Sequence, residues 1–211
     1  PDTMSEQIAA APYSILKIKM GFDGDEALLP VLKKFPGKVF RVDANGGWAL
    51  EKAERMISDL ARARVQLIEQ PTPVEHIKEW PHLKGRAPVN VFVDEGLHTF
   101  EDYQRFMDYV DGINIKMAKS GGIIEAVRIA RRARRDRCKV MLGCMVESSV
   151  AIAPAVYMSS LADYLDLDGP LLLEDDTATG ITYIDDNIII DDTIIGGPKL
   201  KDEYAHGMGE D

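Results

Sequence analysis

The sequence has little cysteine and no long hydrophobic run, and each absence argues against a class of protein. Cys138 and Cys144 are the only cysteines, too few for a disulfide framework, so we expect reduced thiols. No apolar stretch approaches the ~18 residues that a membrane-spanning helix needs, so we expect no membrane partner. Residues 1–13 have neither the basic start nor the apolar core of a signal peptide, and we expect a cytoplasmic protein.

Positive charge is also scarce. Lys and Arg number 25 against 35 Asp and Glu, which gives a formal net charge of −10. Nucleic-acid binding needs concentrated positive charge, so we expect no nucleic-acid partner. The arginines of segment 128–137 are interleaved with apolar residues and are predicted to form the solvated face of a helix. Hydrophobic residues make up 45% of the chain, enough for a packed core.

Short β-rich runs alternate with helical patterns along the chain. Strands that alternate with helices of 10–15 residues pair in parallel through right-handed crossovers. The predicted strands are Ser14–Met20, Lys38–Asp43, Val65–Glu69, Val89–Asp94, Gly112–Lys116, Lys139–Cys144 and Leu171–Glu174. The predicted helices are 24–35, 49–63, 75–83, 99–108, 121–136 and 148–163. Seven such strands favour an α/β fold of the (β/α) TIM-type barrel over an open sheet.

Ionisable side chains end nearly every predicted strand, at intervals of about one βα unit. In a parallel barrel the carboxyl ends of all strands open onto one face, where active sites lie. Residues far apart in the sequence would therefore converge on one cavity. These residues are Lys17, Lys19, Asp43, Glu69, Asp94 and Lys116.

Asp43, Glu69 and Asp94 each follow an apolar strand. Three carboxylates in one cavity repel one another strongly unless a cation neutralises them. Oxygen ligands suit a hard ion, and Mg²⁺ accepts a few carboxylates while keeping positions for water or substrate. The alternative is that each acid caps a helix or pairs locally. Asn45 and Glu95 are weaker candidates, expected to support the site or the loop structure.

Lysines are predicted on both sides of this acidic cluster. Strand alternation puts Lys17 and Lys19 on one face and Ile18 on the other. Two lysines near one another and near a cation favour a neutral amine, which can act as a general base. Lys116 would face the cavity from the opposite side, so that a carbon between Lys19 and Lys116 could exchange its proton and invert. The alternative is an exposed strand whose lysines reach into solvent.

Five motifs together resemble those of one family: KIK at 17–19, DANGGW at 43–48, IEQP at 68–71, VDE at 93–95 and NIKMAKSGG at 114–122. This set is similar to the enolase superfamily, muconate-lactonizing-enzyme subgroup, over about residues 12–195. The resemblance implies a Mg²⁺-dependent isomerase that forms an enediolate from a substrate carboxylate. The implied metal ligands are Asp43, Glu69 and Asp94. The implied acid/base catalysts are Lys19 and Lys116, with electrostatic assistance from Lys17.

An Asp-x-Asp pair resembles a feature of the dipeptide epimerases within this subgroup. Asp166 and Asp168 match the carboxylates that hold the α-ammonium of a dipeptide substrate there, and two adjacent carboxylates suit a small cation. Glu147 matches a supporting position in the same enzymes. The alternatives are an acidic loop at Asp166 and Asp168, and cycloisomerase or o-succinylbenzoate synthase chemistry for the enzyme. An inactive barrel fragment is the alternative of another class.

The resemblance also implies parts that these 211 residues do not contain. We expect residues 1–179 to form about seven of eight barrel strands, without the first strand and without the N-terminal capping domain of the family. Residues 180–211, including the alternating ITYIDDNIIIDD, are expected to pack against that capping domain. Barrels of this family often associate, so a homo-oligomer is an expectation as well.

Overall fold

The computed structural model of the chain describes residues 2–84, 88–191 and 197–205. The chain divides into two compact units, Pro1–Ile113 and Asn114–Asp211, and each is described by itself. Within the described ranges no helix has the length and apolar character needed to cross a membrane.

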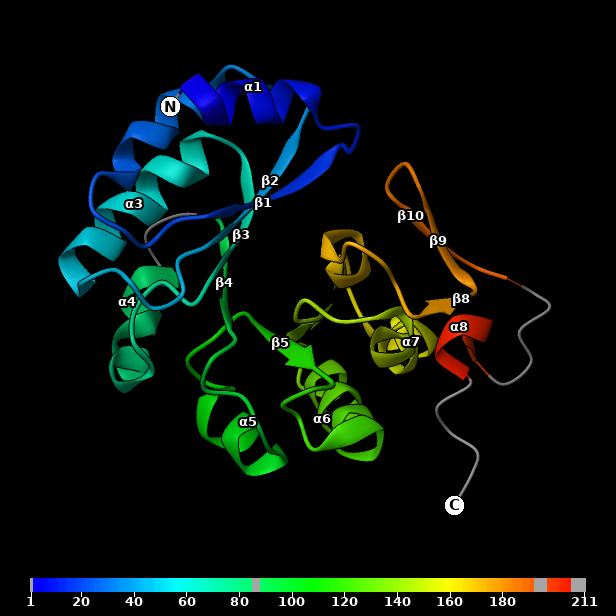
Figure 1. The fold of residues 1–211 in the computed structure, drawn as a ribbon. Helices are drawn as coiled ribbons and strands as arrows, with labels where there is room; N and C mark the ends of the chain where they lie inside the picture. The colour runs from blue at the N-terminus through cyan, green and yellow to red at the C-terminus, as the bar shows by residue number, and fades with distance from the viewer. Residues whose placement is uncertain (1, 85–87, 192–196, 206–211) are drawn as a thin grey trace. The chain divides into compact units, whose positions relative to one another are not determined.

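The first unit is built on parallel strands that follow one another in chain order (Figure 1). They are β1 (Ile15–Lys19), β2 (Val39–Asp43), β3 (Val65–Glu69), β4 (Asn90–Val93) and the start of β5 (Gly112–Lys116). The register pairs Lys19 with Asp43 and Asp43 with Glu69, so the carboxyl ends of the first three strands lie level. This alignment brings residues of separate βα repeats to one edge of the sheet.

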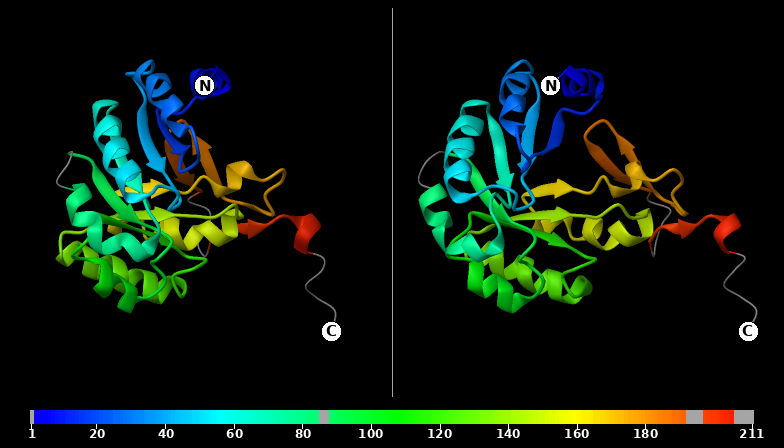
Figure 2. Two further views of the ribbon diagram at one scale, coloured as in Figure 1. Left: turned by 90° about the vertical axis from the view of Figure 1, so that its left-hand side faces the viewer. Right: turned by 60° about the vertical axis from the view of Figure 1, so that its left-hand side comes forward.

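Helix α1 (Asp2–Ala10) precedes β1, and the other helices of this unit connect its strands and cover one face of them (Figure 2). They are η1 (Asp25–Leu28), α2 (Leu29–Lys33), α3 (Leu50–Arg62), η2 (Val74–Glu79), α4 (Trp80–Lys84) and α5 (Phe100–Phe106). In α3, Ala53, Ile57 and Leu60 recur at helical spacing and are buried. At the start of α5, Thr99 and Asp102 form a capping box, because each side chain accepts the other residue's backbone N–H.

The second unit continues the βα repeat. Its elements are the end of β5, α6 (Gly122–Arg135), β6 (Lys139–Gly143), α7 (Ser149–Tyr157), η3 (Ser159–Leu161), β7 (Tyr164–Asp166) and η4 (Gly169–Leu172). Strand β7 pairs in parallel with β6, with Gly143 beside Asp166. The basic segment lies on α6, whose buried side is made of alanines and Ile129, and this agrees with the predicted solvated helix face.

The strand predicted at Leu171–Glu174 is wrong. The seventh strand is β7 at Tyr164–Asp166, and Gly169–Leu172 forms a 3₁₀ helix instead. Pro170 lies in the first turn of this helix, where its fixed φ favours helical backbone. Leu171 and Leu172 are 44% and 63% exposed, so their apolar character does not reflect burial in a sheet.

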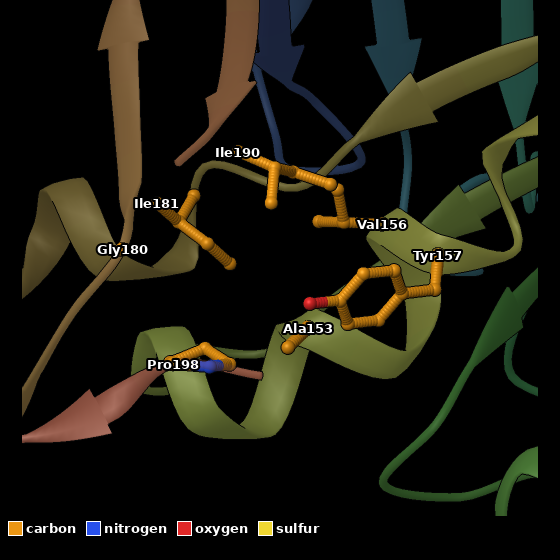
Figure 3. A pocket seen from close by; sticks show the side chains of 7 residues that line it. All are labelled: Ala153, Val156, Tyr157, Gly180, Ile181, Ile190 and Pro198. Atoms are coloured by element: carbon orange, nitrogen blue, oxygen red, sulfur yellow. The ribbon is translucent and has the colours of Figure 1, made fainter. Parts of the chain in front are cut away.

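A β-hairpin follows, as the alternation after Gly180 predicts. Strands β9 (Ile181–Ile184) and β10 (Asn187–Ile190) are antiparallel, while the short β8 (Ala178–Thr179) pairs with β11 (Lys199–Leu200), ahead of α8 (Asp202–Ala205). Figure 3 shows that Ile181 and Ile190 of the hairpin point toward Ala153 and Val156 of α7. This apolar contact packs the hairpin against α7 within the second unit.

A buried carboxylate fastens the loop after β1 to the following repeat. Asp25 accepts hydrogen bonds from the Gly21 amide and the Trp48 indole, both 2.7 Å long, and pairs with Lys52 at 2.7 Å. Gly21 has φ +90°, and a Cβ there would lie 1.9 Å from the carbonyl oxygen of Ala44. The loops after β1 and β2 are therefore in direct backbone contact.

Replacing Asp25 by Asn should lower the free energy of unfolding by about 2–3 kcal/mol at pH 7, because a buried charge pair is broken. Burial raises the pKa of Asp25, but the bonds from Lys52, Trp48 and the Gly21 amide outweigh it and leave the pKa lowered. This stabilisation is present above the unfolded-state pKa and is lost as the pH falls through the lower, folded-state pKa.

Urea unfolding at pH 7 and below pH 4 measures this difference between wild type and variant. The matched control is Asp59→Asn, which removes an exposed i,i+3 pair with Arg62 and should change stability by less than ~0.5 kcal/mol. An equal effect of the two variants at pH 7 would contradict the role given to Asp25.

Candidate active site

Three buried carboxylates meet at the carboxyl ends of β2, β3 and β4. Asp43 and Glu69 are the last residues of their strands, and Asp94 directly follows β4. One carboxylate oxygen from each residue lies within 4.8 Å of the others. The three residues are 0%, 0% and 3% exposed, so water does little to screen their mutual repulsion.

Both lysines of β1 reach this cluster. The Lys17 ammonium lies 3.0 Å from Asp43 Oδ2 and 2.8 Å from Glu69 Oε2. The Lys19 ammonium lies 2.7 Å from the same Asp43 oxygen, while Ile18 between them is buried on the other face. The side chain of Lys17 is 17% exposed and that of Lys19 is 61% exposed. Lys17 is therefore a largely buried counter-ion for Asp43 and Glu69, whereas the Lys19 side chain is mostly exposed to solvent.

The two acids that share Lys17 differ in their protonation. Burial raises the pKa of Glu69 to about 8, against the attraction of Lys17 and with the repulsion of Asp43 and Asp94 adding to the rise. Burial also raises the pKa of Asp43, but Lys17, Lys19 and the Asn45 amide outweigh it and leave the pKa lowered. Without a bound cation, the cluster thus tends to hold a proton near neutral pH.

The donor set fits a hard divalent cation. All three side chains offer carboxylate oxygens, and one oxygen of each lies close enough to the others for a single ion to bind them together. Three ionised carboxylates outnumber the two lysine ammonium groups that reach them, so the ionised cluster keeps an excess of negative charge that a divalent ion would compensate. Asp43, Glu69 and Asp94 are therefore the residues that could hold such an ion.

Gln70 ties two of the strand ends together, and sequence reasoning missed it. Its side-chain oxygen accepts the backbone N–H groups of Asp94 and Glu95 at 3.0 and 3.1 Å, and its amide donates to Thr72 O at 3.0 Å. The residue is 1% exposed and has φ +40°, an uncommon backbone for a residue with a side chain. Gln70 was part of the IEQP motif, but a single glutamine carries no signal of this role.

Asn45 links Lys19 to Glu95. It has φ +45°, and its backbone amide donates to Asp43 Oδ1 at 3.0 Å. Its side chain accepts from Lys19 at 3.1 Å and donates to Glu95 at 2.9 Å. The supporting position expected for Asn45 and Glu95 agrees with these contacts.

The remaining candidates belong to the second unit. Lys116 is the buried last residue of β5, and Asp166 is the last residue of β7. Asp168 follows it by two residues, and Glu147 lies in the loop between β6 and α7, where its carboxylate accepts the Met145 amide at 3.1 Å. Cys144 lies beside Asp168, at 4.0 Å from Oδ1. The meeting of these residues with the carboxylates of the first unit stays a prediction.

A parallel βα repeat with three carboxylates at consecutive strand ends defines an α/β protein with an oxygen-donor cluster suited to a metal ion. Residues 2–193 match the family described as "Enolase C-terminal domain-like". The chain therefore belongs to this family, and the (β/α) barrel fold expected from the sequence is confirmed.

Two curated relatives and one solved structure show which members of the family the chain is similar to. The chain is 41% identical over 179 residues to an "L-Ala-D/L-amino acid epimerase" of Pedosphaera parvula, covering 83% of this chain and 52% of the relative. It is 40% identical to a "Hydrophobic dipeptide epimerase" of Roseobacter litoralis, covering 87% and 56%.

Among solved structures, an enolase family member from Agrobacterium tumefaciens with homology to dipeptide epimerases, containing sodium and L-Ala-L-Glu, is 35% identical to the chain. Its TM-score is 0.85, and the match covers 90% of this chain and 59% of the other. The chain thus spans about half the length of the curated relatives that it matches.

Cation binding should release close to one proton at pH 7, because this pH lies below the Glu69 pKa of about 8 and an ion requires the ionised carboxylates. The release should fade at pH 9, and the apparent affinity should rise up to about tenfold per pH unit below pH 8. Calorimetric titration with Mn²⁺ in buffers of different ionisation enthalpy measures the released proton. Binding enthalpies that do not depend on the buffer at pH 7 would contradict the protonation of the cluster.

Gln70→Met should weaken Mn²⁺ binding about 10- to 100-fold, because the amides that orient Asp94 lose their common acceptor. Electron paramagnetic resonance of free Mn²⁺ gives the dissociation constant. The matched control is Gln66→Met on β3, the strand that precedes Gln70. The Gln66 side chain accepts a hydrogen bond from Arg41 Nε at 2.8 Å and has no assigned role in the cluster. Equal affinities for both variants would exclude an orienting role for Gln70.

Proposed function

We propose that the protein containing this chain is a Mg²⁺-dependent dipeptide epimerase, which inverts the α-carbon of the C-terminal residue. The observation that carries the proposal is the buried carboxylate cluster with Lys19 at its solvent border, 2.7 Å from Asp43. The names of the relatives support the dipeptide substrate. Oxygen donors favour Mg²⁺ over softer metals.

In this proposal Asp43, Glu69 and Asp94 hold the ion. When bound, the ion supplies positive charge that stabilises the carboxylate of the substrate as negative charge develops on it. Lys17 is fixed between Asp43 and Glu69, so it assists electrostatically and does not take the proton. Lys19 has an ammonium that reaches both the cluster and solvent, so it can approach a substrate bound at the ion.

Inversion needs an acid and a base on opposite faces of the α-carbon. The C–H bond breaks as its proton passes to the amine of one lysine, and the electron pair moves into the adjacent carboxylate. A new C–H bond forms on the other face with a proton from the ammonium of the second lysine. We assign these two roles to Lys19 and Lys116, and the reaction needs neither an oxidant nor a reductant.

Asp166 and Asp168, with Glu147 in support, are proposed to bind the α-ammonium of the dipeptide. Paired carboxylates favour a small cation and disfavour substrates without an amine. The division into a barrel (1–179) and a C-terminal segment that packs on a capping domain (180–211), the cytoplasmic location and a homo-oligomeric state stay predictions.

Deuterium uptake tests the proposed function. The full-length protein with Mg²⁺ in D₂O should incorporate deuterium at the C-terminal α-carbon of some members of a dipeptide library, and EDTA should abolish it. Lys19→Ala should lower uptake from at least one epimer about 10²- to 10⁴-fold, because the proton carrier is lost. Mass spectrometry measures uptake, and chiral chromatography measures inversion.

Lys139→Met is the matched control, since this lysine pairs with Asp163 at 2.7 Å and has no assigned role in catalysis. Its uptake should equal that of the wild type. Unaltered turnover of both epimers by Lys19→Ala would exclude the two-base mechanism. Uptake into N-acetylated amino acids or muconate but into no dipeptide would replace the proposed substrate class.

A further inference from the structure

The turn that carries Asp166 and Asp168 is held from one side by a thiol. The Sγ atom of Cys144 accepts the backbone N–H of Gly169 at 3.2 Å and donates to the carbonyl oxygen of Asp166 at 3.3 Å. The Asp166 carbonyl belongs to the first residue of the Asp-Leu-Asp-Gly turn, and the Gly169 N–H belongs to the last. One side chain at the end of β6 therefore spans the whole turn.

The turn also packs directly on the loop after β6. A Cβ added at Gly169 would lie 2.3 Å from the Met145 carbonyl oxygen and 3.2 Å from both the Cys144 sulfur and the Glu147 nitrogen. Any side chain at position 169 would push the two loops apart. The backbone of Glu147 and the Asp166–Gly169 turn are thus parts of one packed arrangement.

A phenol holds the turn at its centre. The Tyr183 hydroxyl donates to the carbonyl oxygen of Leu167 at 2.7 Å, and Leu167 is 3% exposed. Tyr183 lies two residues after Ile181 on β9 and so points to the same side of the hairpin as the contact with α7 in Figure 3. The packing of the hairpin thereby places the phenol beneath the turn.

We propose that Cys144 and Tyr183 are positioning residues, which set the direction of the Asp166 and Asp168 carboxylates toward the substrate ammonium. The inference rests on the proposed function and adds the means by which its ammonium site is built. Neither residue needs to touch the substrate. Tyr183 acts through the backbone of the turn, and Cys144 acts through the same backbone and through its contact with the Asp168 carboxylate at 4.0 Å.

The chemistry of the thiol suits this role. Burial raises the pKa of Cys144 to about 12, against the Gly169 hydrogen bond and with Asp168, Asp166 and Glu147 adding to the rise. The thiol therefore keeps its proton and remains a donor at every working pH. A neutral group can bind the turn without adding negative charge that would compete for the ammonium.

Cys144→Ala and Tyr183→Phe in the full-length protein test the proposal. Each should raise KM for a turned-over dipeptide about tenfold and leave the Mn²⁺ dissociation constant within twofold of wild type. The ratio of kcat/KM for the free dipeptide to that for its N-acetyl derivative should fall about tenfold, since only the free amine uses the carboxylate pair. Cys144→Ser should restore part of the ratio, because a hydroxyl can still accept and donate.

Matched controls are Cys138→Ala, which removes the other cysteine, and Tyr204→Phe, which removes a hydroxyl bonded to Asp175 at 2.8 Å. Both should keep the wild-type ratio. Loss of stability without a change in this ratio would reduce Cys144 and Tyr183 to structural residues and overturn the proposal. If the wild type turns over no dipeptide, the proposed function fails and this proposal fails with it.

Discussion

The burial of three carboxylates at one point is the constraint on which the rest of the first unit depends. Asp43, Glu69 and Asp94 are nearly inaccessible to water, and isolated buried charges are strongly unfavourable. The structure compensates them with Lys17, with the Lys19 ammonium on Asp43, and with protonation that burial favours at Glu69. Both lysine contacts depend on the parallel register of β1, β2 and β3.

The backbone around the cluster follows from this requirement. Parallel register puts Lys19, Asp43 and Glu69 side by side, but Asp94 lies beyond the end of β4. Gln70 bridges that offset by accepting the amides of Asp94 and Glu95. Gln70 and Asn45 both adopt positive φ, which is uncommon outside glycine and is maintained here by their hydrogen bonds. The uncommon backbone of these two residues is therefore found where their side chains hydrogen-bond the loops around the carboxylates.

The sequence predicted the repeat and the carboxylate cluster because both depend on periodicity. The short strands β2, β3 and β4 each end in an acid or are directly followed by one, once per βα unit, and their parallel pairing brings these acids together. The prediction placed the seventh strand wrongly for two reasons. The real strand, Tyr164–Asp166, has only three residues, and the leucines at 171 and 172 resemble a buried strand in the sequence although they are exposed. Gln70, Cys144 and Tyr183 could not be predicted, since they act through backbone groups of other segments, and such contacts leave no pattern in one sequence.

Lys17 also bears on whether the carboxylate cluster can form before an ion binds. Its ammonium already bridges Asp43 and Glu69, so the cluster possesses a cation of its own as soon as β1, β2 and β3 have paired. Pairing of these strands therefore does not depend on a bound ion to neutralise the two carboxylates. In the proposed enzyme, Mg²⁺ would therefore bind at a site that the polypeptide has already assembled around a lysine.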